Sequence, residues 1–287
     1  MIRVGGAPAP SLALPSFARN RRRGRRRSTW LLVSLLVAAP AFPYEIYISN
    51  ERDGTVAVLD GGTHRLLRTI KAGSRPRGIQ ASADGSRVYV ALSDDRPNEE
   101  GSGDAIIAID AATREIAGRF TAGSDPEQFA ISSDGRFLYS SNEDAGTASI
   151  TDVRAAKVLS TLIVGIEPEG VAISPDNRWV YVTAETSNTV SVIDTRAQRV
   201  VTNFLVDPRP RAVAFSPKGP RAYVTAEIGG TVSVVDTKTH RVIDTIELGD
   251  AKPVGVVVSP DGRTVYVANG HAGTVSVIDA ATNKVTA

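Results

Sequence analysis

The sequence has no cysteine among its 287 residues, and it holds only one methionine, two tryptophans and three histidines. Without cysteine, the chain can form no disulfide, attach no c-type haem and offer a metal no thiolate ligand. Three scattered histidines are too few for a transition-metal centre. Ser–His–Asp, nucleophile-elbow and phosphate-loop patterns are also missing. The sequence therefore predicts no cofactor, no metal site and no recognisable catalytic centre, and it leaves open only calcium held by acidic loops.

Acidic residues are absent before residue 44, whereas eight arginines lie there. Removing these eight from the 33 basic residues leaves 25 against 31 acidic ones, so the remainder has a formal charge of −6. A net-negative surface repels the phosphate backbone of nucleic acids. We therefore expect no nucleic-acid partner.

Long apolar runs are missing as well. The run from Trp30 to Ala39 is about half as long as the roughly 20 residues that cross a bilayer. It follows an arginine-rich stretch at 19–27 and precedes Ala39-Pro40-Ala41, which fits a signal-peptide cleavage site. We interpret residues 1–41 as an export signal cleaved near Ala41. This predicts a periplasmic or secreted protein without a stable membrane span; an uncleaved membrane anchor is the alternative.

A fourteen-residue phrase that begins with tyrosine recurs six times in the rest of the chain. Two copies read YVTAETSNTVSVID and YVANGHAGTVSVID, and the second of the six is stretched. The copies begin at Tyr47, Tyr89, Tyr139, Tyr181, Tyr223 and Tyr266. These tyrosines are 42, 50, 42, 42 and 43 residues apart. A β-rich period in the forties is typical of a propeller or a related array.

Each repeat predicts four short strands. In residues 166–207 we expect them at 170–174, 179–183, 189–193 and 199–206, joined by polar turns. Four antiparallel strands in such a repeat make one blade of a β-propeller. The sequence thus predicts an all-β propeller domain over residues 42–287, with a loop insertion at 96–103 that could be decoration or a lid.

One loop position in the repeat predicts a left-handed backbone. It holds glycine in four copies and asparagine in a fifth. The residues are Gly54, Gly146, Asn188, Gly230 and Gly273. Glycine adopts positive φ without steric cost, so we expect φ above zero here.

The strand count predicts an incomplete ring. Four whole blades lie between residues 78 and 248, and we expect three strands at each end. A closing first strand and the last fourth strand are both missing from the pattern. We therefore expect about six blades of a seven-bladed, C-terminally truncated propeller, with closure as six blades as the alternative.

Charged residues differ from blade to blade in the loops that enter the innermost strands. The residues on either side of a proline change sign along the chain: Arg75, Arg77, Asp125, Glu127, Glu167, Glu169, Arg209 and Arg211. These loops share one face of a propeller, and His271 lies on the same face. The pattern predicts a charged mouth that binds a small ligand or a partner protein. The alternative is that neighbouring blades neutralise each other through exposed pairs of little energetic value.

Other charged and titratable residues have less specific roles. A glutamate recurs at one position of the same face: Glu51, Glu143, Glu185 and Glu227. A recurring carboxylate favours a structural role as acceptor for loop N–H groups. Glu127 and Glu169 could instead act as paired carboxylates in acid–base chemistry if they share a desolvated mouth. His64 and His240 lie in turns of the opposite face, where we expect them to be solvated.

The tyrosine phrases, with SPDG turns before them, resemble YVTN-repeat β-propellers over about residues 44–287. The blade-specific segments are similar to those of PQQ-dependent catabolism-associated β-propeller proteins: 75–78, 125–129, 167–170, 209–211 and 227–230. That resemblance implies a periplasmic accessory protein of quinoprotein alcohol catabolism, with no established catalytic residues. It implies no bound PQQ, because quinoprotein dehydrogenases carry eight tryptophan-rich blades.

The sequence therefore favours a periplasmic binding or scaffold protein over an enzyme. One alternative is a lactonase or lyase that uses Glu127 or Glu169 with Arg77 or Arg211. Another is a cell-surface adhesion protein, since YVTN repeats also resemble parts of surface-layer proteins.

Overall fold

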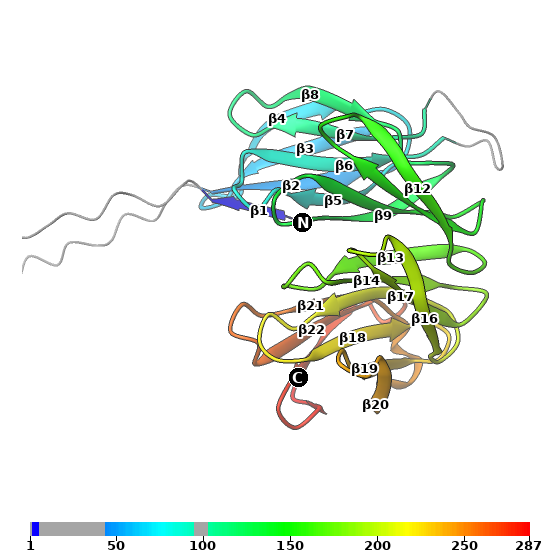
Figure 1. The fold of residues 1–287 in the computed structure, drawn as a ribbon. Coiled ribbons are helices and arrows are strands. Elements are labelled where there is room, and N and C mark those ends of the chain that lie inside the picture. The colour runs from blue at the N-terminus through cyan, green and yellow to red at the C-terminus, as the bar shows by residue number, and fades with distance from the viewer. Residues whose placement is uncertain (1, 6–43, 95–102) are drawn as a thin grey trace, which may run out of the picture.

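The computed structural model describes residues 2–5, 44–94 and 103–287, which form six four-stranded sheets arranged around a common centre (Figure 1). Apart from residues 2–5 and Gly103, the predicted export segment and loop insertion lie outside the described residues. Within those described ranges, no helix has the length and apolarity needed to cross a membrane. The all-β, four-stranded propeller predicted from the sequence is confirmed.

The strands follow one another in chain order within each sheet, and paired neighbours run antiparallel. The first three sheets comprise β1 (Ile2–Gly5), β2 (Tyr44–Asn50), β3 (Thr55–Asp60), β4 (Leu66–Lys71); β5 (Pro76–Ala81), β6 (Arg87–Leu92), β7 (Ala105–Asp110), β8 (Glu115–Phe120); β9 (Pro126–Ile131), β10 (Phe137–Asn142), β11 (Thr147–Asp152) and β12 (Lys157–Ile163). The last three comprise β13 (Pro168–Ile173), β14 (Trp179–Ala184), β15 (Thr189–Asp194), β16 (Arg199–Leu205); β17 (Pro210–Phe215), β18 (Arg221–Ala226), β19 (Thr231–Asp236), β20 (Arg241–Glu247); β21 (Pro253–Val258), β22 (Thr264–Asn269), β23 (Thr274–Asp279) and β24 (Lys284–Val285).

The aspartate that closes the repeat phrase also closes the third strand of a sheet. Asp194 ends β15, and its Oδ1 accepts hydrogen bonds from the backbone N–H groups of Arg196 and Ala197 at 2.9 and 3.0 Å. Such side-chain bonds to the backbone favour a turn over continuation of the strand. The chain therefore reverses here into β16.

The predicted left-handed position is confirmed. The glycines have φ between 63° and 66°, and Asn188 has φ 54°. A Cβ added to Gly230 would lie only 2.1 Å from the carbonyl oxygen of Gly249. Asn188 uses its side chain there, because its Oδ1 accepts the backbone N–H of Arg209 at 2.9 Å. The position thus requires both positive φ and close approach of the next loop.

The repeat tyrosine of each of the first five sheets packs against the following sheet. Tyr181 on β14 lies in a cluster with Val213, Val224 and Val235 of the next sheet. The first five tyrosines are at most 3 % exposed. Contacts between innermost strands likewise run in order from β1 to β5 and onward to β21. Apolar burial between consecutive sheets therefore fixes their succession around the centre.

The sixth sheet has no such cover. Tyr266 on β22 is 41 % exposed, and Val257 and Val275 on the neighbouring strands are 58 % and 57 % exposed. Among the described residues, no contact as extensive as those between consecutive sheets joins the first sheet to the sixth. One apolar sheet face therefore lies open at the end of the series.

The expectation of three strands at each end is wrong for these sheets. β1 pairs with β2, from Ile2 opposite Tyr47 to Gly5 opposite Tyr44, and β24 pairs with the end of β23. The repeat pattern could not predict them, because β1 lies outside the repeats and β24 spans only two residues. β1 also precedes the predicted cleavage point, so removal of residues 1–41 would leave β2 as the innermost strand of the first sheet.

His240 is not solvated as expected, because it packs between two sheets. Its ring lies edge-on to Trp179 at 4.6 Å between ring centroids, and its Nδ1 is 2.7 Å from the Tyr181 hydroxyl oxygen. His64, in the equivalent turn, is exposed as predicted. Burial lowers the pKa of His240, since the charged imidazolium loses solvation there.

The open sheet face predicts that the same Tyr→Ala substitution destabilises the protein less in the sixth sheet than in the fifth. Tyr223→Ala should lower the free energy of unfolding by about 3–5 kcal/mol, because it empties a fully buried aromatic site. Tyr266→Ala should cost only about 1 kcal/mol, since this ring remains partly in solvent. Urea unfolding of both variants checks the difference, and equal losses would show that the sixth sheet is covered in solution.

His240 predicts a specific pH dependence of stability. Its folded pKa lies below the unfolded value, so the unfolded chain binds more protons as the pH falls. Its contribution is complete above the unfolded pKa of about 6.5 and is lost as the pH falls below that value and through the lower folded pKa. Thermal unfolding at pH about 7.5 and about 5 should show a smaller acid loss for His240→Gln than for the wild type. His64→Gln is the control and should behave as the wild type.

Candidate functional site

The loops that enter the innermost strands share one backbone geometry. The residue before the proline is left-handed in each, with φ between 36° and 62°. These residues are Arg75, Asp125, Glu167, Arg209 and Lys252. The carbonyl oxygen of each accepts a backbone hydrogen bond from the loop after the second strand of its sheet, at 2.8–3.4 Å. The donors are Ser93, Glu143, Glu185, Glu227 and Gly270. The two loops are thereby held together on one face, as the sequence predicted.

Arginines of the second sheet form one half of an ion-pair network. Arg77 contacts the carboxylates of Glu127 and, at 3.2 Å, of Glu51. Arg75 lies 3.4 Å from Glu51, 3.8 Å from Glu127 and 3.7 Å from Asp125. Glu127 has no exposed side-chain surface, whereas Arg77 is 19 % exposed. These pairs therefore join the first, second and third sheets in a largely desolvated region.

Arginines of the fifth sheet form the other half. Arg209 lies 2.8 Å from Glu185 and 3.3 Å from Glu227. Arg211 contacts Glu185 as well, and lies 3.9 Å from Glu227. The Glu185 side chain is only 5 % exposed. The fourth and fifth sheets are thus joined in the same way as the first three.

Glu169 connects the two halves. Its Oε1 lies 3.1 Å from Arg211 and 3.8 Å from Arg77, although these arginines come from sheets on either side of it. The structure therefore brings Arg77, Glu127, Glu169 and Arg211 together at one mouth. They neutralise one another, as the alternative hypothesis expected, but in a buried setting and not as exposed pairs.

Burial raises the pKa of both central glutamates. Loss of solvation is the main cause for Glu127; the nearby charge of Glu169 adds to it, and Arg77 opposes it. Loss of solvation also dominates for Glu169, against the opposing charges of Arg211 and Arg77. Both carboxyls hold a proton more readily than an exposed glutamate does.

A set of hydroxyl groups that sequence reasoning missed positions the charged residues. Each donates to the backbone carbonyl of a mouth residue in the next sheet. The bonds run from Ser49 to Arg77 at 2.8 Å, from Ser141 to Glu169 at 2.7 Å, and from Thr183 to Arg211 at 3.1 Å. All three hydroxyls stand two residues after a repeat tyrosine. That repeated serine or threonine was the available sequence signal.

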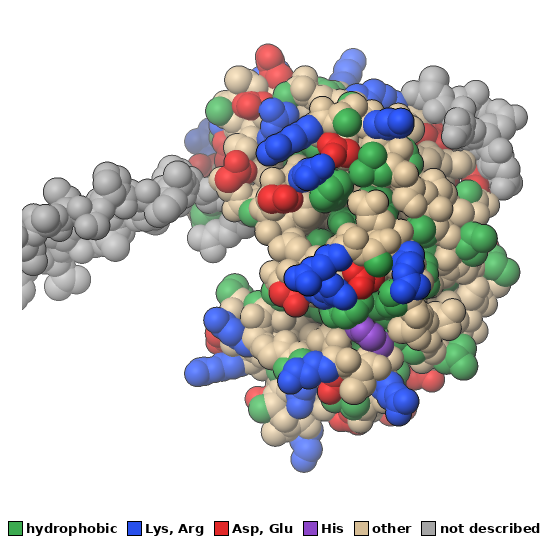
Figure 2. Space-filling view, in the orientation of Figure 1, with side chains coloured by type: hydrophobic (Ala, Val, Ile, Leu, Met, Phe, Trp, Pro, Cys, Tyr) green, Lys and Arg blue, Asp and Glu red, His purple; other side chains and the backbone are tan. Residues whose placement is uncertain are grey.

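A cavity of about 700 Å³ opens at the centre of the charged mouth. Arg77, Glu169 and Arg211 line it together with Gln80 and Gln128. The remaining walls are mainly apolar and include Ile79, Val171, Val213, Val256 and Tyr266. Figure 2 shows basic and acidic side chains side by side around the hollow between the two halves of the molecule. The mouth thus combines a few charged groups with an apolar wall.

Two predicted site residues lie apart from this cluster. Glu167 is exposed, and its carboxylate accepts a hydrogen bond from the Thr186 hydroxyl. His271 is 60 % exposed and lies 3.7 Å from Asp250 of the sixth sheet's entering loop. Neither residue lines the central cavity.

The predicted structural role of the recurring glutamates takes a different form. Glu51, Glu185 and Glu227 contact arginines, and no side-chain carboxylate among them accepts a loop N–H bond in the described residues. Guanidinium groups compete successfully for these oxygens because charge-assisted bonds are the stronger ones. Glu51 and Glu185 thus bridge neighbouring sheets, whereas Glu227 contacts the arginines of its own sheet's entering loop.

Six antiparallel sheets around a central mouth define a β-propeller, a scaffold that presents loop side chains for binding. Residues 101–259 match the YNCE-like β-propeller family. The chain therefore belongs to the YNCE-like β-propeller family.

Solved structures support the same fold. A functionally unknown protein from Desulfotomaculum acetoxidans is similar with a TM-score of 0.70 and 20 % identity, over 84 % of this chain and 77 % of that one. Hydrazine synthase of Kuenenia stuttgartiensis is similar with a TM-score of 0.56 and 22 % identity, over 71 % of this chain and 76 % of that one. At these identities the likeness concerns the fold alone. The search of curated proteins found no match.

The buried network predicts a large effect of one substitution. Arg211→Gln should lower the free energy of unfolding by about 3 kcal/mol, because two buried carboxylates, Glu169 and Glu185, each lose one of their guanidinium partners. The matched control is Arg68→Gln, whose pair with Glu115 is exposed on both sides and should contribute only about 0–1 kcal/mol. Urea unfolding measures both. Similar small losses would mean that the mouth is solvated.

Proposed function

We propose that the chain is a periplasmic binding protein that takes a small ligand, or a polar group of a partner protein, into the cavity at its mouth. The observation that carries the proposal is the convergence of Arg77, Glu169 and Arg211 on one cavity of about 700 Å³. This volume lies within the range of small-molecule sites, roughly 300–1,000 Å³. A few convergent polar groups in an otherwise apolar wall are also typical of such sites.

The charge balance of the cavity favours a particular ligand class. Arg77 and Arg211 are already paired with glutamates, so a ligand carboxylate would have to displace an internal carboxylate. An uncharged polar molecule needs no such displacement. Its polar end would meet guanidinium donors and the Glu169 acceptor, while Val171 and Val213 would contact its apolar part.

We place this binding role in the periplasm as an accessory to quinoprotein alcohol catabolism. Two sequence features support the placement: the predicted export signal at 1–41 and the blade-specific segments that resemble the PQQ-associated propellers. Small alcohols and their carbonyl products are uncharged and polar, which agrees with the ligand class that the cavity favours.

An enzyme of the lactonase or lyase type is the second candidate. It is favoured by one observation, the raised pKa of Glu169 at the wall of the cavity. A carboxyl that exchanges a proton nearer neutral pH is suited to general acid–base catalysis. Arg77 and Arg211 beside it could stabilise an oxyanion.

Ligand binding can be tested with protein prepared from the periplasmic fraction of the native host. We expect short alcohols, aldehydes or lactones to raise the thermal unfolding midpoint, because a ligand that binds only the folded state stabilises it. Gln128→Ala removes a polar group from the cavity wall and should reduce that rise. Asn203→Ala removes an exposed amide on the outer strand β16 and should leave it unchanged.

The outcomes distinguish the two candidates. Turnover of a lactone that is lost in Glu169→Gln would replace the binding role by the enzymatic one. No response to any of these probes would contradict a small-ligand site of this class. Full-length chain in the cytoplasm, identified by N-terminal sequencing, would contradict the periplasmic placement.

A further inference from the structure

The ion-pair network follows a rule from one sheet to the next. In the first and fourth sheets, the glutamate four residues after the repeat tyrosine contacts the two arginines of the next sheet's entering loop, whereas Glu227 of the fifth sheet contacts those of its own sheet. In the first sheet Glu51 contacts Arg75 and Arg77, and in the fourth sheet Glu185 contacts Arg209 and Arg211. A guanidinium thus occupies the space beside each of these carboxylates.

The third sheet breaks the rule. Glu143 is its equivalent glutamate, but the next entering loop holds Glu167 and Glu169 where arginines would stand. Among the described residues, no arginine or lysine lies within ion-pair distance of Glu143, although its neighbours in the mouth are themselves acidic. The space that a guanidinium fills beside Glu51 and Glu185 therefore lacks a protein cation beside Glu143.

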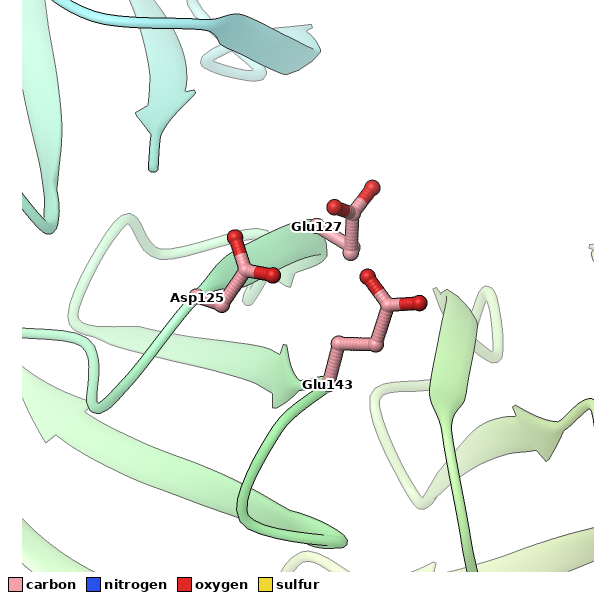
Figure 3. Close-up of side chains that lie close together, drawn as sticks. All are labelled: Asp125, Glu127 and Glu143. Atoms are coloured by element: carbon pink, nitrogen blue, oxygen red, sulfur yellow. The ribbon is translucent and has the colours of Figure 1, made fainter. Parts of the chain in front are cut away.

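Three carboxylates meet at this place. Asp125 and Glu127 stand on either side of the proline that begins β9, and Glu143 follows β10 (Figure 3). One carboxylate oxygen from each lies within 4.8 Å of the others. The backbone bond between the two mouth loops of this sheet explains the cluster, because the Glu143 N–H donates to the Asp125 carbonyl at 3.1 Å.

Glu127 is ion-paired, but its hydrogen bonding is incomplete. It is completely buried, and neither of its carboxylate oxygens has a hydrogen-bond donor. Arg77 touches it and Arg75 lies 3.8 Å away, but neither forms a hydrogen bond with it. A buried Asp125 oxygen also lacks a donor. Buried carboxylates with unfilled oxygens are costly unless a cation or donor completes them.

The local charge points the same way. Glu51, Asp125 and Glu127 pair with the guanidiniums of Arg75 and Arg77, whereas Glu143 pairs with neither. These four carboxylates stand beside two guanidiniums. The formal charge of the group is therefore −2. One divalent cation would neutralise it.

We propose that Asp125, Glu127 and Glu143 bind a hard divalent cation, with Ca²⁺ preferred. Ca²⁺ takes oxygen ligands at about 2.3–2.6 Å, so two oxygens on one ion stand at most about 5 Å apart, as these three do. Asp125 and Glu143 are only partly buried, which leaves room for water to complete the coordination. Mg²⁺ requires a tighter octahedron at about 2.0–2.1 Å and suits this wider group less well.

The bound ion would take the place that an arginine of the following sheet has beside Glu51 and Glu185. It would hold the third sheet's two mouth loops together and fix Glu127 beside Arg77. This role does not depend on the ligand class proposed for the cavity, whose wall includes none of the three carboxylates.

Calorimetric titration of chelator-treated full-length protein with CaCl₂ tests the site. We expect one site per chain, and a thermal midpoint that rises with Ca²⁺, since the ion binds the folded state. Glu143→Gln should weaken Ca²⁺ binding by at least about tenfold, because affinity follows the number of charged ligands. Asp125→Asn is the second variant and should do the same.

Glu185→Gln is the matched control, because it makes the same change at the same repeat position where arginines already stand. It should keep the Ca²⁺ affinity of the wild type even if its stability falls. Absence of Ca²⁺ binding by the folded wild type would overturn the proposal and leave a shared proton to neutralise the cluster. Binding that survives both Glu143→Gln and Asp125→Asn would overturn it as well, by moving the ion elsewhere. Mg²⁺ binding with no response to Ca²⁺ would overturn the preference for the larger ion.

Discussion

Burial of a tyrosine-bearing sheet face against the next sheet is the interaction on which this molecule depends. The aromatic ring and the β-branched residues around it lose contact with water only when the following sheet is in place, as for Tyr181 beneath Val213 and Val224. The chain therefore adds sheets in sequence order around one centre. Because every sheet begins at that centre, its entering loop is delivered to the same face. The mouth is a consequence of apolar packing far from the charged residues.

At the mouth, hydrogen bonds and ion pairs have different structural roles. Backbone and hydroxyl groups set where each loop lies, through repeated bonds such as that of the Thr183 hydroxyl to the Arg211 carbonyl. Side-chain charges then join neighbouring sheets across the centre, with Glu169 reached from both sides. Removing one partner of a buried ion pair destabilises the protein, because the other charge stays buried without compensation. The same desolvation shifts the proton affinity of Glu127 and Glu169 and gives the mouth its chemical character.

Sequence period and turn chemistry predicted most of the fold. Alternating β-branched residues located β14 and β15, and glycine at a repeated position predicted the left-handed loop at Gly230. Both features depend only on residues close together in the sequence, so a single repeat is enough to predict them. β1 was not predictable in this way, because its pairing with β2 joins segments without a shared pattern. The solvation of His240 was also misjudged, since burial there comes from Trp179 and Tyr181 of another sheet.

The sequence predicted which charged residues form the centre of the candidate site, but it did not predict that their ion pairs are buried. The change of charge around the prolines identified Arg77, Glu127, Glu169 and Arg211, which the structure brings together. Whether such pairs are exposed or buried depends on the distances between side chains of three different sheets. The sequence of a single repeat does not determine these distances. Glu167 shows the limit, because it shares the pattern of its neighbours and yet stands in solvent.

The left-handed residue before each proline has a consequence for how such a mouth diverges. Its carbonyl holds the adjacent loop whether the side chain is that of Arg75, Asp125, Glu167 or Lys252. Backbone geometry at these positions is thus indifferent to side-chain identity. A single codon change at one of these positions can therefore alter the charge presented at the mouth while the loop keeps its shape.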